Sequence, residues 1–232
     1  MTAFLSASQA ARLRKIARRY QKKVKLGKPW NNRSEDELWR KVLSQIVVVG
    51  RAEPGYELEH NPKVGKRVAI KKLMRFRNDT ELQKYLHEFL LSIETRFVSK
   101  KQGWRNDKKA RAGGHNFKVL TEAGGPKKFF EKVANLPTES QRIQFLEDSF
   151  EYYAEKGARD TLIELGLAEN CMALDVRIYG VLEKVGVRVS PDDIYSQIEK
   201  ELIEKVARPL GISGGRLDRI LFQNYSEIIQ ES

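Results

Sequence analysis

Apolar residues recur at intervals of three and four positions along most of the chain, which is the spacing typical of amphipathic helices. The N-terminal stretch predicts a helix from about Ser6 to Val24, whose apolar face consists of Ala10, Leu13, Ala17 and Tyr20. No pair of alternating segments joined by an Asn-Gly or Asp-Gly turn indicates a β-hairpin. The pattern therefore predicts an all-α protein.

The next helix is strongly apolar and opens with a capping box. Ser34 is followed by Glu37, at the spacing that lets each side chain bond to the backbone N–H of the other residue. The run from Leu38 to Val49 is apolar on most of its sides, so we expect a central core helix. Prolines, glycines and cations between residues 50 and 78 predict a loop with one short helix.

A predicted helix from Asp79 to Phe97 is followed by a basic segment, Ser99 to His115. This segment combines many cations with glycines and Trp104, which favours a loop that contacts a phosphate backbone or wedges into DNA. A solvated linker whose Trp104 packs into the core explains the same pattern.

Three further helices are predicted in close succession, at Phe117–Ala123, Pro126–Asn135 and Thr138–Ala154. Thr138 and Gln141 form a second capping box. A later helix over Ile194–Ala207 is expected to begin with Ser190, Pro191, Asp192 and Asp193, and the last helix with Ser213. We expect two helical lobes, residues 1–135 and 136–232, that form one compact unit with a cleft between them.

The charge balance adds a candidate partner to this picture. Lysine and arginine number 43 against 31 acidic residues in 232, which gives a formal charge of +12 at pH 7. A field of this size attracts polyanions, so nucleic acid is the expected partner. A basic surface that is merely solvated accounts for the same composition.

Cysteine and histidine usage excludes several kinds of site. A single cysteine, Cys171, excludes a disulfide framework, a four-cysteine zinc site and a four-cysteine iron–sulfur cluster. The histidines, His60, His87 and His115, lie far apart, so we expect no metal site and no cofactor. No stretch approaches a membrane span, and we expect an intracellular monomer, cytoplasmic or at the nucleoid or nucleus, without a membrane partner.

The stretch from Glu155 to Ile178 resembles the core of the helix-hairpin-helix DNA glycosylases. In that superfamily a hairpin leads into a short helix that begins near a lysine, and an aspartate preceded by small or apolar residues opens the next helix. Lys156 and Asp175 stand at these places. The likeness is closest to the 8-oxoguanine DNA glycosylases, including their compact archaeal-type members.

Further positions carry the same likeness. The family pattern of a lysine, an alanine, a leucine and a closing glycine in the short helix is matched by Lys156, Ala158, Leu162 and Gly166. Leu38–Ile46 is similar to the first buried helix of the family, and Leu217–Phe222 looks like the Leu-Asp helix that closes the compact members. The resemblance implies an all-α, two-lobed glycosylase fold with a helix-hairpin-helix element.

The resemblance also implies a chemistry. A damaged base, with 8-oxoguanine favoured, would be flipped out of double-stranded DNA, and the Asp175 carboxylate would stabilise the positive charge that develops as the N-glycosidic bond breaks. A desolvated lysine can attack C1′ and form a Schiff base, which would make Lys156 the nucleophile of a linked abasic-site lyase.

The chain departs from the family pattern at the hairpin. Relatives present a Gly-x-Gly turn just before the lysine, whereas this sequence has Tyr152-Tyr153-Ala154-Glu155 and places Gly157 after it. Arg177 stands where relatives often carry histidine. These departures favour a second hypothesis, an inactive DNA-structure-binding protein on the same scaffold; an RNA-associated helical protein is less favoured because no RNA-binding motif is present.

Purely structural interpretations remain open for the main candidates. Asp175 is explained as a helix N-cap, and Lys156 as a lysine that complements the dipole at a helix C-terminus.

The predicted DNA contacts are Lys100, Lys101, Arg105, Lys108, Lys109, Arg111, Gly157, Arg159 and Arg177. The candidates for stacking on a base or wedging into the duplex are Trp104, Trp39 and Phe222.

Overall fold

The computed structural model describes residues 4–189 and 194–231, and over these residues all regular structure is helical, as the apolar spacing predicts. The chain divides into two compact units. The central unit spans residues 29–161, and the terminal unit combines residues 1–28 with residues 162–232. No helix within the described ranges is long and apolar enough to cross a membrane.

These units differ from the lobes expected at 1–135 and 136–232. The N-terminal helix α1 (Ala7–Tyr20) packs its apolar face against helices near the C-terminus, so both ends of the chain share one core. The segment 136–161 belongs to the central unit instead. Sequence order did not reveal this division because it depends on contacts between distant segments.

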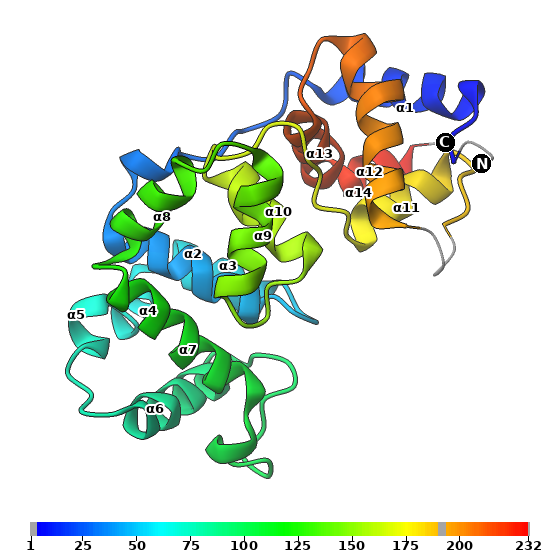
Figure 1. The fold of residues 1–232 in the computed structure, drawn as a ribbon. Coiled ribbons are helices and arrows are strands. Elements are labelled where there is room, and N and C mark those ends of the chain that lie inside the picture. The colour runs from blue at the N-terminus through cyan, green and yellow to red at the C-terminus, as the bar shows by residue number, and fades with distance from the viewer. Residues whose placement is uncertain (1–3, 190–193, 232) are drawn as a thin grey trace. The chain divides into compact units, whose positions relative to one another are not determined.

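The central unit is built around α2 (Glu35–Val47), which is buried along most of its length. Helices α3 (Glu53–His60), α5 (Ile70–Leu73), α7 (Lys108–Glu122) and α8 (Pro126–Ala134) pack against it (Figure 1). The predicted capping box of Ser34 and Glu37 is present at its start. The prediction of a central core helix is therefore confirmed.

The remaining elements of the central unit are η1 (Trp30–Asn32), α4 (Pro62–Arg67), α6 (Asp79–Ser92), η2 (Trp104–Asn106), α9 (Glu139–Ser149) and the start of α10 (Glu155–Glu164). The region from 50 to 78 holds three short helices, α3, α4 and α5, where one was expected. Helix α6 ends before Phe97, because Glu94 and Phe97 adopt left-handed backbone angles, with φ of 54° and 66°.

Helix α7 begins inside the segment predicted as a loop. Asp107 caps it, because its Oδ1 accepts hydrogen bonds from the backbone N–H groups of Lys109 and Ala110 at 2.9 and 3.1 Å. Gly113, read as a loop residue, lies where α7 packs closely: a Cβ there would stand 3.3 Å from a Leu86 methyl group. The loop prediction for residues 108–115 is therefore wrong.

The terminal unit packs α1 with α11 (Val176–Lys184), α12 (Tyr195–Leu202), α13 (Gly214–Gln223) and α14 (Tyr225–Gln230) around one apolar core. The helix predicted over Ile194–Ala207 changes to a π-helical turn, η3 (Ile203–Ala207), followed by η4 (Arg208–Leu210). Its expected start at Ser190 to Asp193 lies outside the described residues. Ser213 caps α13, as predicted, but α14 follows, so α13 is not the last helix.

Asp107 generates a stability prediction for the central unit. Its second oxygen, Oδ2, lies 2.8 Å from Nδ1 of the buried His87, so Asp107→Ala removes a helix cap and leaves a buried imidazole nitrogen without this partner. We expect the free energy of unfolding to fall by about 2 to 3 kcal/mol, measured by chemical denaturation. The matched control is Asp79→Ala, at an exposed ion pair with Lys118, which should cost less than about 1 kcal/mol. Equal losses in the two variants would contradict the prediction.

Candidate active site

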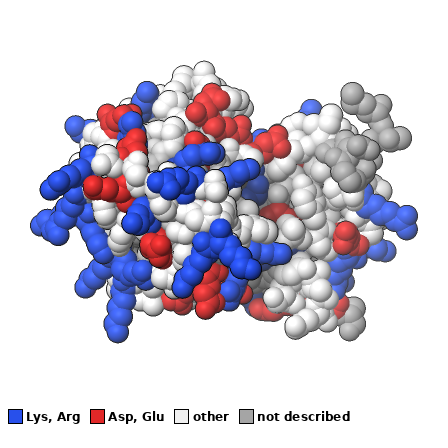
Figure 2. All heavy atoms as spheres, turned by 90° about the horizontal axis from the view of Figure 1, so that it is seen from below, with Lys and Arg blue, Asp and Glu red and all other residues white. Residues whose placement is uncertain are grey.

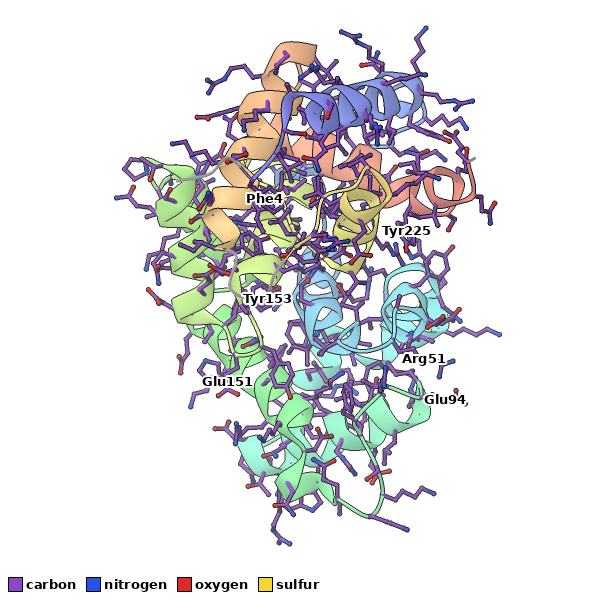
Figure 3. All side chains as sticks on the ribbon, turned by 90° about the vertical axis from the view of Figure 1, so that its right-hand side faces the viewer. Phe4, Arg51, Glu94, Glu151, Tyr153 and Tyr225 are labelled. Atoms are coloured by element: carbon purple, nitrogen blue, oxygen red, sulfur yellow. The ribbon has the colours of Figure 1, made fainter. Side chains whose placement is uncertain are left out.

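A hairpin of residues 150–154 joins α9 to α10 and forms a helix-hairpin-helix element. The predicted helix over Thr138–Ala154 thus ends at Ser149, while its capping box of Thr138 and Gln141 is confirmed. Buried Asn116 of α7 holds the hairpin: its Oδ1 accepts from the N–H of Glu151 at 2.8 Å, and its Nδ2 donates to the carbonyl of the same residue at 3.0 Å. Figure 3 labels Glu151 and Tyr153 of this hairpin.

Tyr152 occupies the left-handed region of the backbone map, with φ of 64°. A β-carbon makes this region costly by about 1 to 2 kcal/mol, which is why glycine is favoured there. Its neighbours offset the cost, because Phe150 stacks on Phe129 at 4.8 Å and contacts the ring of Tyr153 at 4.9 Å. The turn therefore forms without the glycines that the family pattern would supply.

Lys156 follows the hairpin in the first turn of α10. The interpretation of this residue as a C-terminal helix lysine is therefore wrong. Its side chain is 34% exposed, and its Nζ lies 3.5 Å from Oδ2 of Asp160, one helical turn further along.

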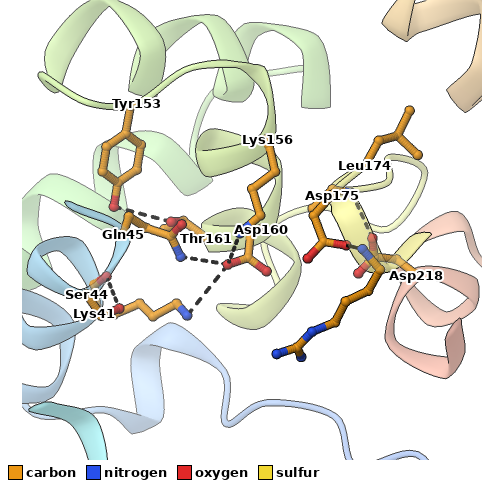
Figure 4. Close-up of polar contacts among 12 residues, drawn as sticks. Lys41, Ser44, Gln45, Tyr153, Lys156, Asp160, Thr161, Leu174, Asp175 and Asp218 are labelled. Atoms are coloured by element: carbon orange, nitrogen blue, oxygen red, sulfur yellow. Dashed lines mark hydrogen bonds and ion pairs between the residues drawn. The ribbon is translucent and has the colours of Figure 1, made fainter. Parts of the chain in front are cut away.

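Asp160 connects Lys156 to the interior of the central unit (Figure 4). Gln45 of α2 donates from Nε2 to Oδ2 of Asp160 at 2.6 Å, and Nζ of Lys41 lies 3.9 Å from the same oxygen. Lys41 also lies 3.6 Å from Oε1 of Glu59 in α3. Lys41 is thus paired with the carboxylates of Asp160 and Glu59, as a buried charge requires.

Tyr153 packs beside this cluster. It is buried, its hydroxyl accepts from Oγ1 of Thr161 at 3.3 Å, and it donates to the carbonyl of Val42 at 3.4 Å. Burial raises the pKa of Tyr153, with the carboxylates of Asp160 and Glu59 adding to the increase. The phenol is therefore neutral at physiological pH.

Asp175 is the N-cap of α11 in the terminal unit. Its Oδ1 accepts from the N–H groups of Arg177 and Ile178 at 3.0 and 3.1 Å, which confirms the capping interpretation. Both bonds use the same oxygen, so Oδ2 takes no part in the cap. A half-buried carboxylate with one oxygen outside the cap keeps an acceptor for a further charge or donor.

The backbone before Asp175 is held by side chains of α12. The hydroxyl of Tyr195 accepts from the N–H of Leu174 at 2.7 Å and donates to the carbonyl of Met172 at 2.8 Å. Glu199 accepts from the N–H of Met172 at 2.8 Å. These bonds fix the path of the chain into the N-cap.

Helix α13 holds the same segment from another direction. Buried Asp218 accepts from the N–H of Ala173 at 2.8 Å, and it pairs with the guanidinium of Arg219 at 2.6 Å. The guanidinium carbons of Arg177 and Arg219 lie 4.4 and 5.1 Å from the ring centre of Phe222. Phe222, a stacking candidate, is half-buried, and its ring already contacts these two cations.

Several predicted DNA contacts are exposed on the central unit, namely Lys100, Lys101, Arg105, Lys108 and Arg111. Trp104 is half-buried under Arg105, whose guanidinium carbon lies 4.6 Å from the indole ring. In the view of Figure 2, many Lys and Arg side chains stand out from the surface, with acidic side chains scattered among them. This distribution suits a phosphate backbone.

Other predicted contacts lie inside the protein and require correction. Trp39 is fully buried and donates to the carbonyl of Val68 at 2.9 Å, so it is core, with no surface for a base. Lys109 is buried, and its Nζ donates to the carbonyl of Val49 at 2.9 Å. Arg159 is also buried, and its guanidinium donates to the carbonyl of Glu155 at 3.1 Å. Gly157 is half-buried in the first turn of α10, so its contact with DNA stays a prediction.

Sequence reasoning missed the residues that hold the candidates in place. Asn116, Asp160, Tyr195 and Glu199 carry no motif, and their partners are distant in sequence or on the backbone. The described ranges contain no group of three or more His, Cys, Asp or Glu side chains placed to hold a metal ion.

The comparisons with known proteins agree on the fold. No protein-family model matches the sequence, and no curated protein is similar enough in sequence to match. The structure is similar to the 8-oxoguanine DNA glycosylase of Thermotoga maritima, with 19% identity over 93% of each chain and a TM-score of 0.62.

Structures from Methanocaldococcus jannaschii are similar as well. Its 8-oxoguanine DNA glycosylase is 16% identical over 92% of this chain and 91% of that chain, with a TM-score of 0.62. Its 8-oxoguanine glycosylase/lyase in complex with a 15mer DNA containing 8-oxoguanine is 16% identical over 97% and 99%, with a TM-score of 0.61. The chain therefore has the all-α fold of the 8-oxoguanine DNA glycosylases, and the fold expected from the resemblance is confirmed.

Tyr152 allows a test of the hairpin backbone. Tyr152→Gly and Tyr152→Ala remove the same phenol ring, but only glycine adopts a φ of 64° without strain. We expect the glycine variant to be more stable than the alanine variant by about 1 kcal/mol in chemical denaturation. An alanine variant of equal or greater stability would show that the turn does not hold this conformation in solution.

Lys109 allows a test of pH dependence. Burial lowers its pKa from 10.5 to about 8, although nearby Asp107 acts in the opposite direction. Between these values the unfolded chain retains the proton that the folded protein has released, so the free energy of unfolding rises with pH. We expect the stability of the wild type relative to Lys109→Met to increase between pH 7 and pH 10, measured by denaturation at both values. A constant difference would contradict the burial of this ammonium group.

Proposed function

We propose that the protein is a DNA repair glycosylase that excises a damaged base, with 8-oxoguanine as the favoured lesion. The observation that carries this proposal is the glycosylase fold over more than nine-tenths of the chain together with Lys156 directly after the hairpin and Asp175 at the N-cap of α11. Its similarity to a glycosylase/lyase in complex with lesion-containing DNA makes double-stranded DNA the proposed partner.

In this proposal Asp175 promotes cleavage of the N-glycosidic bond. The bond breaks with positive charge developing on the sugar, and a carboxylate held in place stabilises that charge better than mobile water does. The helix cap holds Oδ1 of Asp175, and the backbone that precedes it is held by Tyr195, Glu199 and Asp218. The carboxylate therefore has a fixed position.

Lys156 is the proposed nucleophile of a linked lyase step. Its neutral amine attacks C1′ as the N-glycosidic bond breaks, and the base leaves with one of the amine's protons. The C1′–O4′ bond of the sugar ring then opens, O4′ takes a proton from water, and a protonated Schiff base forms. Loss of a proton from C2′ then breaks the bond between C3′ and its phosphate oxygen, which nicks the strand. The position of Lys156 in the first turn of α10, partly exposed, suits this role.

The exposed cations of residues 100–111 are proposed to contact phosphates, and Trp104 or Phe222 to stack on or wedge beside a base. The second hypothesis is a DNA-structure-binding protein that has lost turnover. The absence of hairpin glycines favours it, but the left-handed backbone at Tyr152 keeps the turn and weakens that argument.

The decisive experiment uses end-labelled duplexes that carry 8-oxoguanine, uracil, hypoxanthine or an alkylated purine, resolved with and without alkali. We expect cleavage at one lesion, a loss of at least about 100-fold in Asp175→Asn, and a borohydride-trapped complex that disappears in Lys156→Gln. Asparagine is as good an N-cap as aspartate, so the fold is preserved in the first variant.

The matched control is Asp79→Asn, which changes an exposed carboxylate at the start of α6 and should retain full activity. Salt-sensitive binding without cleavage of any duplex by the wild type would instead establish the binding protein.

A further inference from the structure

Asp160 is the point at which the interior of the central unit reaches Lys156. Its Oδ2 lies 2.6 Å from Nε2 of Gln45, 3.5 Å from Nζ of Lys156 and 3.9 Å from Nζ of Lys41. The donors come from α2 and α10, and Asp160 itself is only 10% exposed. One carboxylate oxygen is therefore shared between a buried ammonium group and a partly exposed one.

The two lysines differ in their surroundings. Lys41 is 6% exposed and lies between two carboxylates, those of Asp160 and Glu59. Lys156 is 34% exposed, and its Nζ lies 3.5 Å from the same Oδ2 of Asp160. A charge as buried as that of Lys41 requires an opposite charge nearby, so part of the field of Asp160 acts on Lys41.

We infer that Asp160 is a positioning residue for Lys156, and that buried Lys41 weakens the hold of Asp160 on the charged form of that amine. The inference rests on the proposed role of Lys156 as nucleophile. An amine attacks only after it loses its proton, and a nearby carboxylate opposes that loss. Lys41, which lies 3.9 Å from the same oxygen, offsets part of this field, so Asp160 anchors Lys156 while opposing the loss of its proton less than an isolated carboxylate would.

The other ionisable groups near the cluster do not replace these effects. They are Glu59 of α3, Tyr153 of the hairpin, and Glu155 and Arg159 of α10. Tyr153 is neutral, Glu59 lies on the inner side against Lys41, and Arg159 faces Glu147 at 3.7 Å. Asp160 is the carboxylate that contacts Nζ of Lys156.

Opposite shifts follow for the two partners. Replacing Lys41 with glutamine leaves the full charge of Asp160 acting on Lys156, so the amine should lose its proton at a pH higher by about one unit. Replacing Asp160 with asparagine removes the anion and leaves two lysines close together, so the amine should lose its proton at a lower pH. The same variant should form the Schiff base several-fold more slowly at saturating pH, because the anchor is weakened.

The test measures Lys156 in two independent ways. The pH midpoint of acetylation of its amine is followed by peptide mass spectrometry in Lys41→Gln, Asp160→Asn, the double variant and Lys41→Arg. The rate of borohydride trapping on a preformed abasic-site duplex is followed in parallel. Arginine keeps the buried charge, so Lys41→Arg should retain the wild-type midpoint, and the double variant should lie between the single variants.

The outcomes separate this inference from the proposed function. Midpoints that move in opposite directions support the coupling, and slower trapping in Asp160→Asn supports the positioning role. Wild-type midpoints in folded Lys41→Gln and Asp160→Asn, with trapping intact, would overturn the inference and leave the proposed function standing. Shifted midpoints with no trapping by the wild type would remove the proposed nucleophile role while leaving the coupling of the three residues in place.

Discussion

The structure of the central unit depends on how α2 satisfies its polar side chains after being buried on almost every side. Lys41 and Gln45 point into the protein, where water cannot solvate them, so the protein itself must supply their partners. Asp160 accepts a hydrogen bond from Gln45 and pairs with Lys41, and Glu59 adds a second anion for Lys41. Because Asp160 lies on α10, satisfying the core helix also sets the place of the helix that carries Lys156.

The terminal unit holds its candidate by a different device. Asp175 needs no charged partner of its own, since two backbone N–H groups of α11 bind one of its oxygens. The preceding residues are fixed through their backbone by Tyr195, Glu199 and Asp218, and their own side chains are buried in the core. Rigid placement of this carboxylate is therefore a property of α12 and α13 as much as of the segment that contains it.

Local signals were readable in the sequence, and long-range partners were not. The capping boxes at Ser34 and Thr138, the core helix α2 and the N-cap at Asp175 depend on residues within a few positions of each other, and each was predicted. The buried state of Lys109 depends on the carbonyl of Val49, just beyond the end of α2, and its charge suggested the surface instead. The unit boundaries failed for the same reason, because α1 is completed by helices from the other end of the chain.

The hairpin at Tyr152 has the backbone turn of the motif without the glycines of its sequence pattern. A left-handed residue turns the chain, and what such a turn offers to an incoming phosphate is the direction of its amide groups, which any residue provides. Glycine adopts that conformation without strain. For tyrosine, the strain is offset by the hydrogen bonds of Asn116 and by the packing of the rings around Phe150. A sequence pattern that requires glycines at this turn would not match the chain, although the helix-hairpin-helix element is present. The backbone geometry of such a turn is therefore recognisable even where the glycines are absent.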